Sequence, residues 1–329
     1  MRMKKICLLI ACIALSTTIW AQNDEPTAVL HHGDQMSVFT GSSAFVQAHD
    51  AAENGDVINL SAGVFTPTTI TKAISVFGTG FEQNETTGTD VTVINGVIYL
   101  NVASDLLLEG ISVNGNIEAQ CDMENITIRK CMIEKFRSRA ISNSWIYQCV
   151  FNSGIEAIID GTIATDFHIT NCLVRWVARF GMASTLYVDH CLVAGGWKEG
   201  YDTYSNTFTY TNCIFTYSKD GDYRYTGRNA QMTNCIYVSE AKVNPEAILT
   251  NCYLVALADI FIDGEDGTYS PERTYELKQP DVWVGTDGTP IGPSGGMGWN
   301  KVPTTPVVKN LQLNVVGRTL NVNYEAEIR

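Results

Sequence analysis

The sequence predicts an all-β solenoid, in which short strands wind into coils that stack on one another. The first observation is a four-residue phrase ending in cysteine that recurs between Ile128 and Leu254. Its cysteines are Cys131, Cys149, Cys172, Cys191, Cys213, Cys235 and Cys252, at steps of 18, 23, 19, 22, 22 and 17 residues. The second observation is that no helix-forming stretch separates the phrases. Self-similarity at a period near twenty residues is typical of repeats that stack on their neighbours.

The phrase itself predicts a bend between two short strands. In Ile169-Thr170-Asn171-Cys172-Leu173-Val174 the apolar residues stand three apart and then two apart. A strand alternates its faces with period two, so the three-residue step requires a bend. Asparagine is the non-glycine residue that best tolerates a left-handed backbone there. We therefore expect Asn171, Asn212, Asn234 and Asn251 to stack, with the cysteines lining the core and Gly110 in the position of Cys131 one coil earlier.

These phrases resemble the right-handed parallel β-helix of the pectate-lyase-like superfamily, whose coils carry asparagine ladders at the same kind of bend. The resemblance covers residues 42–300 and implies about ten coils. Ser42-Ser43 can begin a short helix through Glu53, followed by a strand from Val57, an order similar to the amino-terminal cap of such proteins. The glycine-rich residues 285–299 resemble the closing segment of β-helix proteins exported by the Bacteroidetes.

The two ends of the chain lie outside this region. Residues 1–21 have a basic start, an apolar run and Ala21 before a cleavage position, which predicts a secretory signal. Residues 22–41 are expected to be a leader or a first edge strand. Residues 301–329 read as a linker and a hairpin-like β tail, which could cap the last coil or serve surface attachment. The expected location is secreted, periplasmic or on the outer cell surface, with lipoprotein anchoring at Cys12 as the alternative. No other run is long and apolar enough to span a bilayer.

The net charge limits the classes of partner that the chain can bind, and the placement of the cysteines predicts their redox state. The formal net charge is −13, which argues against nucleic acid as a partner. An anionic polysaccharide would need a local cationic cluster or a bridging metal. Such a cluster is offered by a group of basic residues, for which a solvated face is the alternative: Arg129, Lys130, Lys135, Arg137, Arg139, Arg175 and Arg179. Eight cysteines follow the signal, and the side chains of all but Cys121, which is outside the register, should point in parallel into the core. We therefore expect packed, mostly reduced thiols.

One stretch resembles catalytic residues of the superfamily. Val188-Asp189-His190-Cys191 is similar to the calcium-binding phrase of pectate lyases. The resemblance implies a calcium site of Asp189, Glu199 and Asp202. It also implies Lys219 as a substrate-binding lysine and Arg224 or Arg228 as the base of a β-elimination on a uronate. The alternative is structural: His190 then occupies the ladder bend and Asp189 an outward strand position. The carboxylates of the loop from Asp263 could also hold calcium or form a solvated turn.

Aromatic residues between the phrases predict a sugar-binding surface. Flat rings flanked by charged side chains suit stacking on sugar faces, and inter-coil stacking is the alternative. The candidate substrate-binding residues are Trp197, Tyr201, Tyr204, Tyr223, Arg224 and Tyr225. We predict a monomeric secreted or cell-surface protein that engages polysaccharide with weak or no catalysis. A calcium-dependent lyase acting through Lys219 and Arg228 is the enzyme alternative, and an adhesin or structural surface protein is the third.

Overall fold

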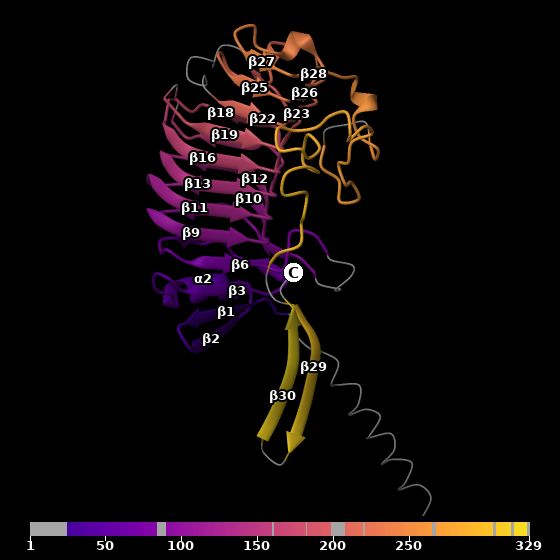
Figure 1. Cartoon of the computed structure of the whole chain (residues 1–329). Helices are drawn as coiled ribbons and strands as arrows, with labels where there is room; N and C mark the ends of the chain where they lie inside the picture. Colours follow the sequence, from indigo (N-terminus) through magenta and orange to yellow (C-terminus); the bar gives the residue numbers. More distant parts are fainter. Residues whose placement is uncertain are drawn as a thin grey trace, which may run out of the picture.

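The chain is a parallel β-solenoid of about nine turns, where the sequence led us to expect about ten (Figure 1). The computed structural model describes residues 25–83, 90–159, 161–181, 183–198, 208–219, 221–264, 268–304, 307–316 and 319–327. Two long sheets run along the solenoid, and each coil contributes a strand to both. We call them sheet A and sheet B.

The strands follow one another along the solenoid axis. In spatial order, sheet A contains β2 (Gln35–Thr40), β1 (Thr27–His32), β3 (Val57–Leu60), β6 (Ser75–Phe77), β9 (Ser104–Glu109), β11 (Met123–Arg129), β13 (Ile141–Tyr147), β16 (Ala164–Thr170), β19 (Leu186–Asp189), β22 (Thr209–Thr211), β25 (Gln231–Thr233) and β27 (Ile248–Thr250). Sheet B contains β4 (Gly63–Phe65), β7 (Thr92–Ile94), β10 (Ser112–Ala119), β12 (Met132–Ser138), β14 (Val150–Phe151), β17 (Leu173–Val174), β20 (Leu192–Val193), β23 (Ile214–Phe215), β26 (Ile236–Tyr237) and β28 (Tyr253–Leu254), with β5 (Thr69–Ile70), β8 (Ile98–Leu100), β15 (Gly154–Ala157) and β18 (Trp176–Ala178) paired beside this path.

From the coil of β9 onward, a left-handed bend joins the sheet A strand of each coil to its sheet B strand. The bend residues have φ between 47° and 70°: Gly110, Lys130, Gln148, Asn171, His190, Asn212, Asn234 and Asn251. The predicted bend is therefore confirmed. The register assigned to Gly110 was wrong by one residue, because Glu109 pairs with Arg129 and Gly110 thus stands level with Lys130. Glycine is used here for its positive φ, and it is Ile111 that fills the core position of Cys131.

The cysteines line the core as free thiols, as expected from their register. Those from Cys131 to Cys235 are buried. The Cys172 thiol donates to the Thr170 carbonyl oxygen at 3.2 Å, and the Cys172 N–H donates to the Cys191 sulfur at 3.3 Å. The Cys172 thiol therefore satisfies a carbonyl at its own bend, and the Cys191 sulfur links that bend to the following coil.

The amino-terminal end of the solenoid is closed. Helix α2 (Ala44–Ala51) buries Ala44, Phe45 and Ala48 against the first coil, which agrees with the predicted helical cap. The antiparallel strands β1 and β2 extend sheet A beyond β3. The edge-strand alternative for this region is therefore the one observed.

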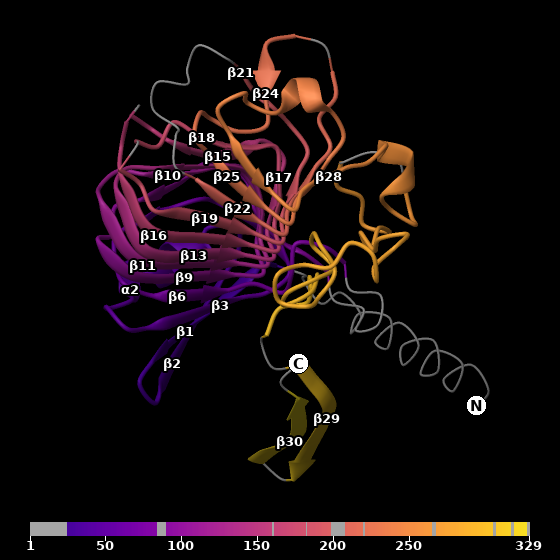
Figure 2. The same ribbon diagram turned by 45° about the horizontal axis from the view of Figure 1, so that its top comes forward.

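Residues 283–304 run back along the row of bends, and we call them the strap (Figures 1 and 2). Asn234 Nδ2 donates to the Val284 carbonyl oxygen at 3.3 Å. Further contacts follow in reverse coil order: Asn171 Nδ2 to Pro293 O at 2.9 Å, Gln148 Nε2 to Gly298 O at 2.9 Å, and Lys130 Nζ to Val302 O at 2.5 Å. The bend side chains thus bind the strap more than one another.

The strap ends on a buried carboxylate. Glu109 is fully buried and lies 2.7 Å from Arg129. Its Oε1 atom accepts hydrogen bonds from the Thr304 N–H at 2.6 Å and the Thr304 hydroxyl at 2.8 Å. Charge-assisted bonds of this kind are among the stronger ones in proteins. Glu109 therefore fixes the end of the strap to the coil of β9.

The segment that precedes the strap covers part of sheet B. The outward row of Leu173, Leu192, Ile214 and Ile236 is buried beneath it in a second hydrophobic cluster. The covering side chains include Phe261 and Tyr275 of this segment and Trp283 and Ile291 of the strap. Short elements complete this region and the coil connections: β21 (Trp197–Lys198), β24 (Tyr223–Arg224), η1 (Glu240–Lys242) and η2 (Leu257–Asp259).

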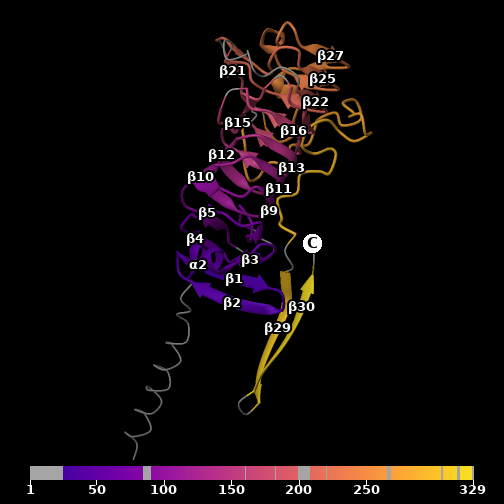
Figure 3. The same ribbon diagram turned by 90° about the vertical axis from the view of Figure 1, so that its left-hand side faces the viewer.

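The carboxyl-terminal tail is an antiparallel hairpin, as predicted. It consists of β29 (Val307–Val316) and β30 (Thr319–Glu327). Figure 3 shows it extending away from the amino-terminal end of the solenoid and not over the last coil. No helix among the described residues has the length and apolar character needed to cross a membrane.

We expect Asn171→Ala to lower the free energy of unfolding by about 3 kcal/mol. About 1 kcal/mol comes from placing alanine in the left-handed region, and the rest from two lost buried hydrogen bonds, to Pro293 and Gly295. The matched variant Asn171→Gly keeps the bend but loses the bonds, so it should lose about 2 kcal/mol. Urea unfolding of the three proteins measures both values. Equal stability of wild type and Asn171→Ala would contradict the structural role of this bend.

Candidate functional site

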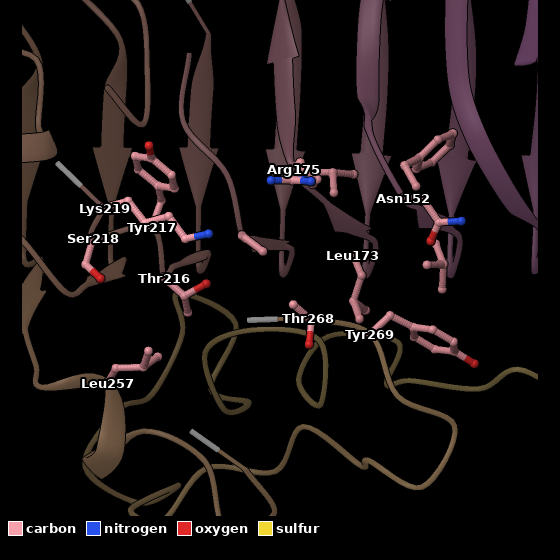
Figure 4. A pocket seen from close by; sticks show the side chains of 14 residues that line it. Asn152, Leu173, Arg175, Thr216, Tyr217, Ser218, Lys219, Leu257, Thr268 and Tyr269 are labelled. Atoms are coloured by element: carbon pink, nitrogen blue, oxygen red, sulfur yellow. The ribbon is translucent and has the colours of Figure 1, made fainter. Parts of the chain in front are cut away.

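A groove of about 530 Å³ lies between sheet B and the segment that leads into the strap (Figure 4). Its first wall comes from the ends of β14, β17 and β23 and the residues after them, among them Asn152, Arg175 and Lys219. Its second wall comes from Leu257, Thr268 and Tyr269. In Figure 4 these two sets of side chains face one another across the opening.

The groove runs along the solenoid axis. Val150 pairs with Leu173, Leu173 with Leu192, and Leu192 with Ile214, so its first wall crosses four successive coils. Adjacent strands are about 4.8 Å apart, which makes the three steps about 14 Å long. A groove of this length and open form suits an extended chain better than a compact small molecule.

Two cationic side chains line the groove. Arg175 and Lys219 are both exposed. Within the described part of the chain, neither pairs with a carboxylate, although Arg175 lies 5.8 Å from the ring of Trp176. On a protein of net charge −13, this is a local positive site. It would attract a carboxylate or sulfate group.

The groove also holds a buried hydroxyl that lacks a partner. Thr216 is 5% exposed, and its Oγ1 atom has no hydrogen-bond partner among the described residues. An unsatisfied buried hydroxyl costs about 1–3 kcal/mol, which a ligand hydroxyl could recover. Tyr217 and Ser218 place further hydroxyl-bearing side chains along the same opening, and Tyr269 lines it with its ring, since its hydroxyl is buried. Sequence reasoning missed Thr216 and Tyr269, because neither belongs to a recognisable motif.

Asp189 lies at a bend, outside the groove. Its Oδ1 atom accepts a hydrogen bond from Asn212 Nδ2 at 3.1 Å, and its Oδ2 atom lies 2.9 Å from His190 Nδ1. His190 is buried with φ of 47°, and its Nε2 atom lies 3.1 Å from the Thr289 hydroxyl of the strap. Both carboxylate oxygens of Asp189 are therefore engaged by neighbouring side chains, and His190 occupies the ladder bend. These are the positions that the structural alternative to a calcium site predicted.

The other residues of the predicted lyase site divide into two groups. Glu199 and Asp202 lie outside the described residues, as do Tyr201 and Tyr204. Arg228 is exposed and stands 3.8 Å from Glu246, away from the groove. Among the described residues there is no cluster of three or more His, Cys, Asp or Glu side chains that could hold a metal ion. Of the candidate catalytic residues, the groove contains Lys219.

The predicted aromatic surface forms only in part. Trp197 pairs through its backbone with Arg224, whose side chain donates to the Ala241 carbonyl oxygen, and Tyr223 is exposed. The expectation that Tyr225 points outward is wrong. Tyr225 is 2% exposed, its ring centroid lies 5.2 Å from that of Phe215, and burial raises the pKa of its hydroxyl.

Most of the predicted basic cluster is neutralised. Glu156 is buried and lies within 3.4 Å of Lys135, 3.2 Å of Arg137 and 3.6 Å of Arg179. A carboxylate surrounded by three cations leaves them little capacity for an external anion. Arg175 is the member of the cluster that lines the groove.

The loop at Asp263 is an internally bonded turn. Partial burial raises the pKa of Asp263, but the N–H groups of Thr274 and Tyr275 and the nearby Arg273 outweigh it. Together they hold this pKa below its usual value of 3.8. The carboxylate is thus committed to the protein, and it orders the segment that supplies Thr268 and Tyr269 to the groove.

Comparison with known proteins adds no assignment: no protein-family model matches the chain, and no curated protein matches it. The side chains of the groove indicate the kind of ligand that it can hold. Cations, phenol rings and hydroxyl groups along an open channel can recognise sugars by charge, stacking and hydrogen bonding.

We expect the stability contributed by Asp263 to be lost in acid. Since its pKa is lower in the folded chain than in the unfolded chain, the unfolded chain takes up the proton first as the pH falls. The contribution is therefore present above about pH 4 and disappears as the pH falls through the folded pKa. Asp263→Asn should be less stable than wild type at pH 7, and the gap should narrow below pH 4.

Urea unfolding midpoints measured from pH 7 to pH 3 test this expectation. The matched control is Asp259→Asn, because Asp259 is exposed in the same segment. A gap between Asp263→Asn and wild type that stays constant over this range would contradict the proposed origin of the acid sensitivity.

Proposed function

We propose that the protein is a secreted or cell-surface solenoid that binds a polysaccharide in the groove, with weak or no catalysis. The observation that carries the proposal is the coexistence of Arg175, Lys219 and the unpartnered Thr216 hydroxyl in one open channel. The predicted signal at residues 1–21 supports an extracellular setting, where polysaccharides are the abundant linear polymers.

The form of the groove supports a polymeric ligand. Its first wall spans four successive coils and its second wall faces the first, so an extended chain can lie along it. Arg175 and Thr216 come from different coils, which allows contacts with successive sugar units. Tyr217 adds a ring and a hydroxyl that can contact sugars, and Tyr269 adds a ring.

The positions of the lyase candidates favour binding over β-elimination. Elimination requires a metal or cation to neutralise the uronate while a base removes the C5 proton. In the described residues, Asp189 is engaged at a bend, Arg228 stands beside Glu246, and Lys219 lies in the groove. These three side chains belong to three different environments.

We expect Arg175→Ala and Lys219→Ala each to weaken glycan binding by about tenfold, which corresponds to the loss of one charge-assisted contact of about 1.4 kcal/mol. Thr216→Val should weaken it by a similar factor because it removes the hydroxyl at nearly constant volume. Titration calorimetry with the full chain and a panel of neutral and uronate-containing polysaccharides provides the measurement. Arg228→Ala is the matched control, since it removes an exposed arginine outside the groove.

Binding that is unaffected by all three groove variants would place the ligand elsewhere and refute the proposal. The same polysaccharides should be followed by ultraviolet absorbance with calcium added. Unsaturated product that forms with wild type and is lost in Asp189→Ala would establish a lyase instead.

A further inference from the structure

Both sheets of the solenoid end on the same coil, and this coil is open. Strand β27 is the last in sheet A and β28 the last in sheet B, and no strand in the described ranges pairs beyond either. Both lie at the upper end of the molecule in Figure 1. The opposite end differs, because α2 covers it and β1 and β2 carry sheet A past sheet B.

The core is exposed at the open coil. Leu249 continues the inward row that holds Tyr210 and Met232, which are buried, yet Leu249 is 38% exposed. Leu254 continues the inward row of Phe215 and Tyr237, and it is 56% exposed. Side chains that form the core in every preceding coil therefore face solvent here, which is typical of an interaction surface.

The backbone at this edge has unused hydrogen-bonding groups. The Ile248 N–H donates to Ala230 O, and Thr250 O accepts from the Asn234 N–H, so both point back to the preceding coil. Successive residues of a strand point these groups in opposite directions, so the N–H and C=O of Leu249 point over the open edge. The same alternation places those of Leu254 over the edge of β28, because the Tyr253 and Val255 N–H groups donate to the preceding coil. Such an edge is a template for another strand.

The charge pattern favours another copy of the chain as the partner. Residues 247–258 contain no charged side chain, although the protein carries a net charge of −13. Proteins commonly protect an exposed edge strand with charged residues. Because β27, β28 and the residues between them lack charged side chains, two copies can pair there without like charges on the facing strands.

We infer that two copies of the chain stack end to end through the coil of β27 and β28, about a two-fold axis. Antiparallel pairing centred on Leu249 places this residue opposite Leu249 of the second copy as a hydrogen-bonded pair. Ile248 then stands opposite Thr250, so inward residues meet inward residues and outward residues meet outward ones. The interface is self-complementary and closed, and it joins the two open cores.

A head-to-tail contact satisfies the same surface less well. At the amino-terminal end α2 covers the core and β1 and β2 extend sheet A past sheet B, so a copy docked there could pair β27 but would not meet an open core. The carboxyl-terminal coil is the end at which both sheets finish together. The inferred dimer departs from the monomer expected from the sequence, and it is independent of the glycan proposal because the groove lies along the side of the coils.

Sedimentation equilibrium of the full chain tests the inference. We expect twice the chain mass for wild type and the single-chain mass for Leu249→Lys/Leu254→Lys. The double variant should raise the dissociation constant of the dimer by at least about a hundredfold. Met36→Lys/Val38→Lys is the matched control, since it adds two lysines at exposed apolar positions of β2 at the other end. It should remain dimeric.

Crosslinking gives a second measurement that does not depend on a disruptive variant. A hydrogen-bonded antiparallel pair has Cα atoms about 5.5 Å apart, within the range that a disulfide spans. Leu249→Cys should therefore form a covalent dimer under mild oxidation, whereas Val38→Cys should not. A wild type of single-chain mass at all concentrations, together with uncrosslinked Leu249→Cys, would overturn the inference. Assemblies that grow without limit and are abolished by the β2 variant would overturn it in favour of head-to-tail stacking.

Discussion

The left-handed bend between sheet A and sheet B is the constraint on which the rest of the structure depends. Each coil must turn there within one residue, and a non-glycine residue in that conformation is disfavoured by about 1–2 kcal/mol. Asparagine and glycine reduce this penalty at several coils, but Lys130, Gln148 and His190 hold the same conformation. What these residues share is a long or polar side chain that reaches the strap. The bend is therefore stabilised from outside the solenoid as well as by its own sequence.

The strap connects the bends to the groove. Its contacts with Asn234, Asn171, Gln148 and Lys130 follow the coils in order, and Glu109 holds its end. The same carboxyl-terminal region buries the outward leucine and isoleucine row of sheet B and supplies the second wall of the groove. Conditions that release the strap should therefore alter the groove before they unfold the coils. In this fold, the groove on the side of the solenoid therefore depends on the polar side chains at the bends.

The sequence was informative where the repeat governs structure. Period and spacing predicted the solenoid, the bend at Asn171 and the buried cysteines. They failed at Gly110, because the bend and the core select different residues one position apart. They also failed to predict the groove, since Thr268 and Tyr269 come from a segment without periodicity that packs on distant coils. In the sequence, Thr216 looks like any outward strand residue, and the structure shows that it lines a groove opposite Thr268 and Tyr269. Arg175 was identified as basic, but only the positions of Glu156 and its three partners distinguish it from its neighbours.

The aromatic residues show why ring content is a poor guide to sugar binding in this architecture. Parallel coils place equivalent residues directly above one another, so outward rings stack on each other. Trp145, His168 and Tyr187 do this on sheet A, with ring centroids 5.6 Å and 4.9 Å apart. Their faces are then occupied by neighbouring rings, and mainly edges remain for a ligand. The proposed recognition of a polymer therefore requires a place where a non-repeating segment interrupts the ladder, and the groove that Leu257, Thr268 and Tyr269 form with sheet B meets this requirement.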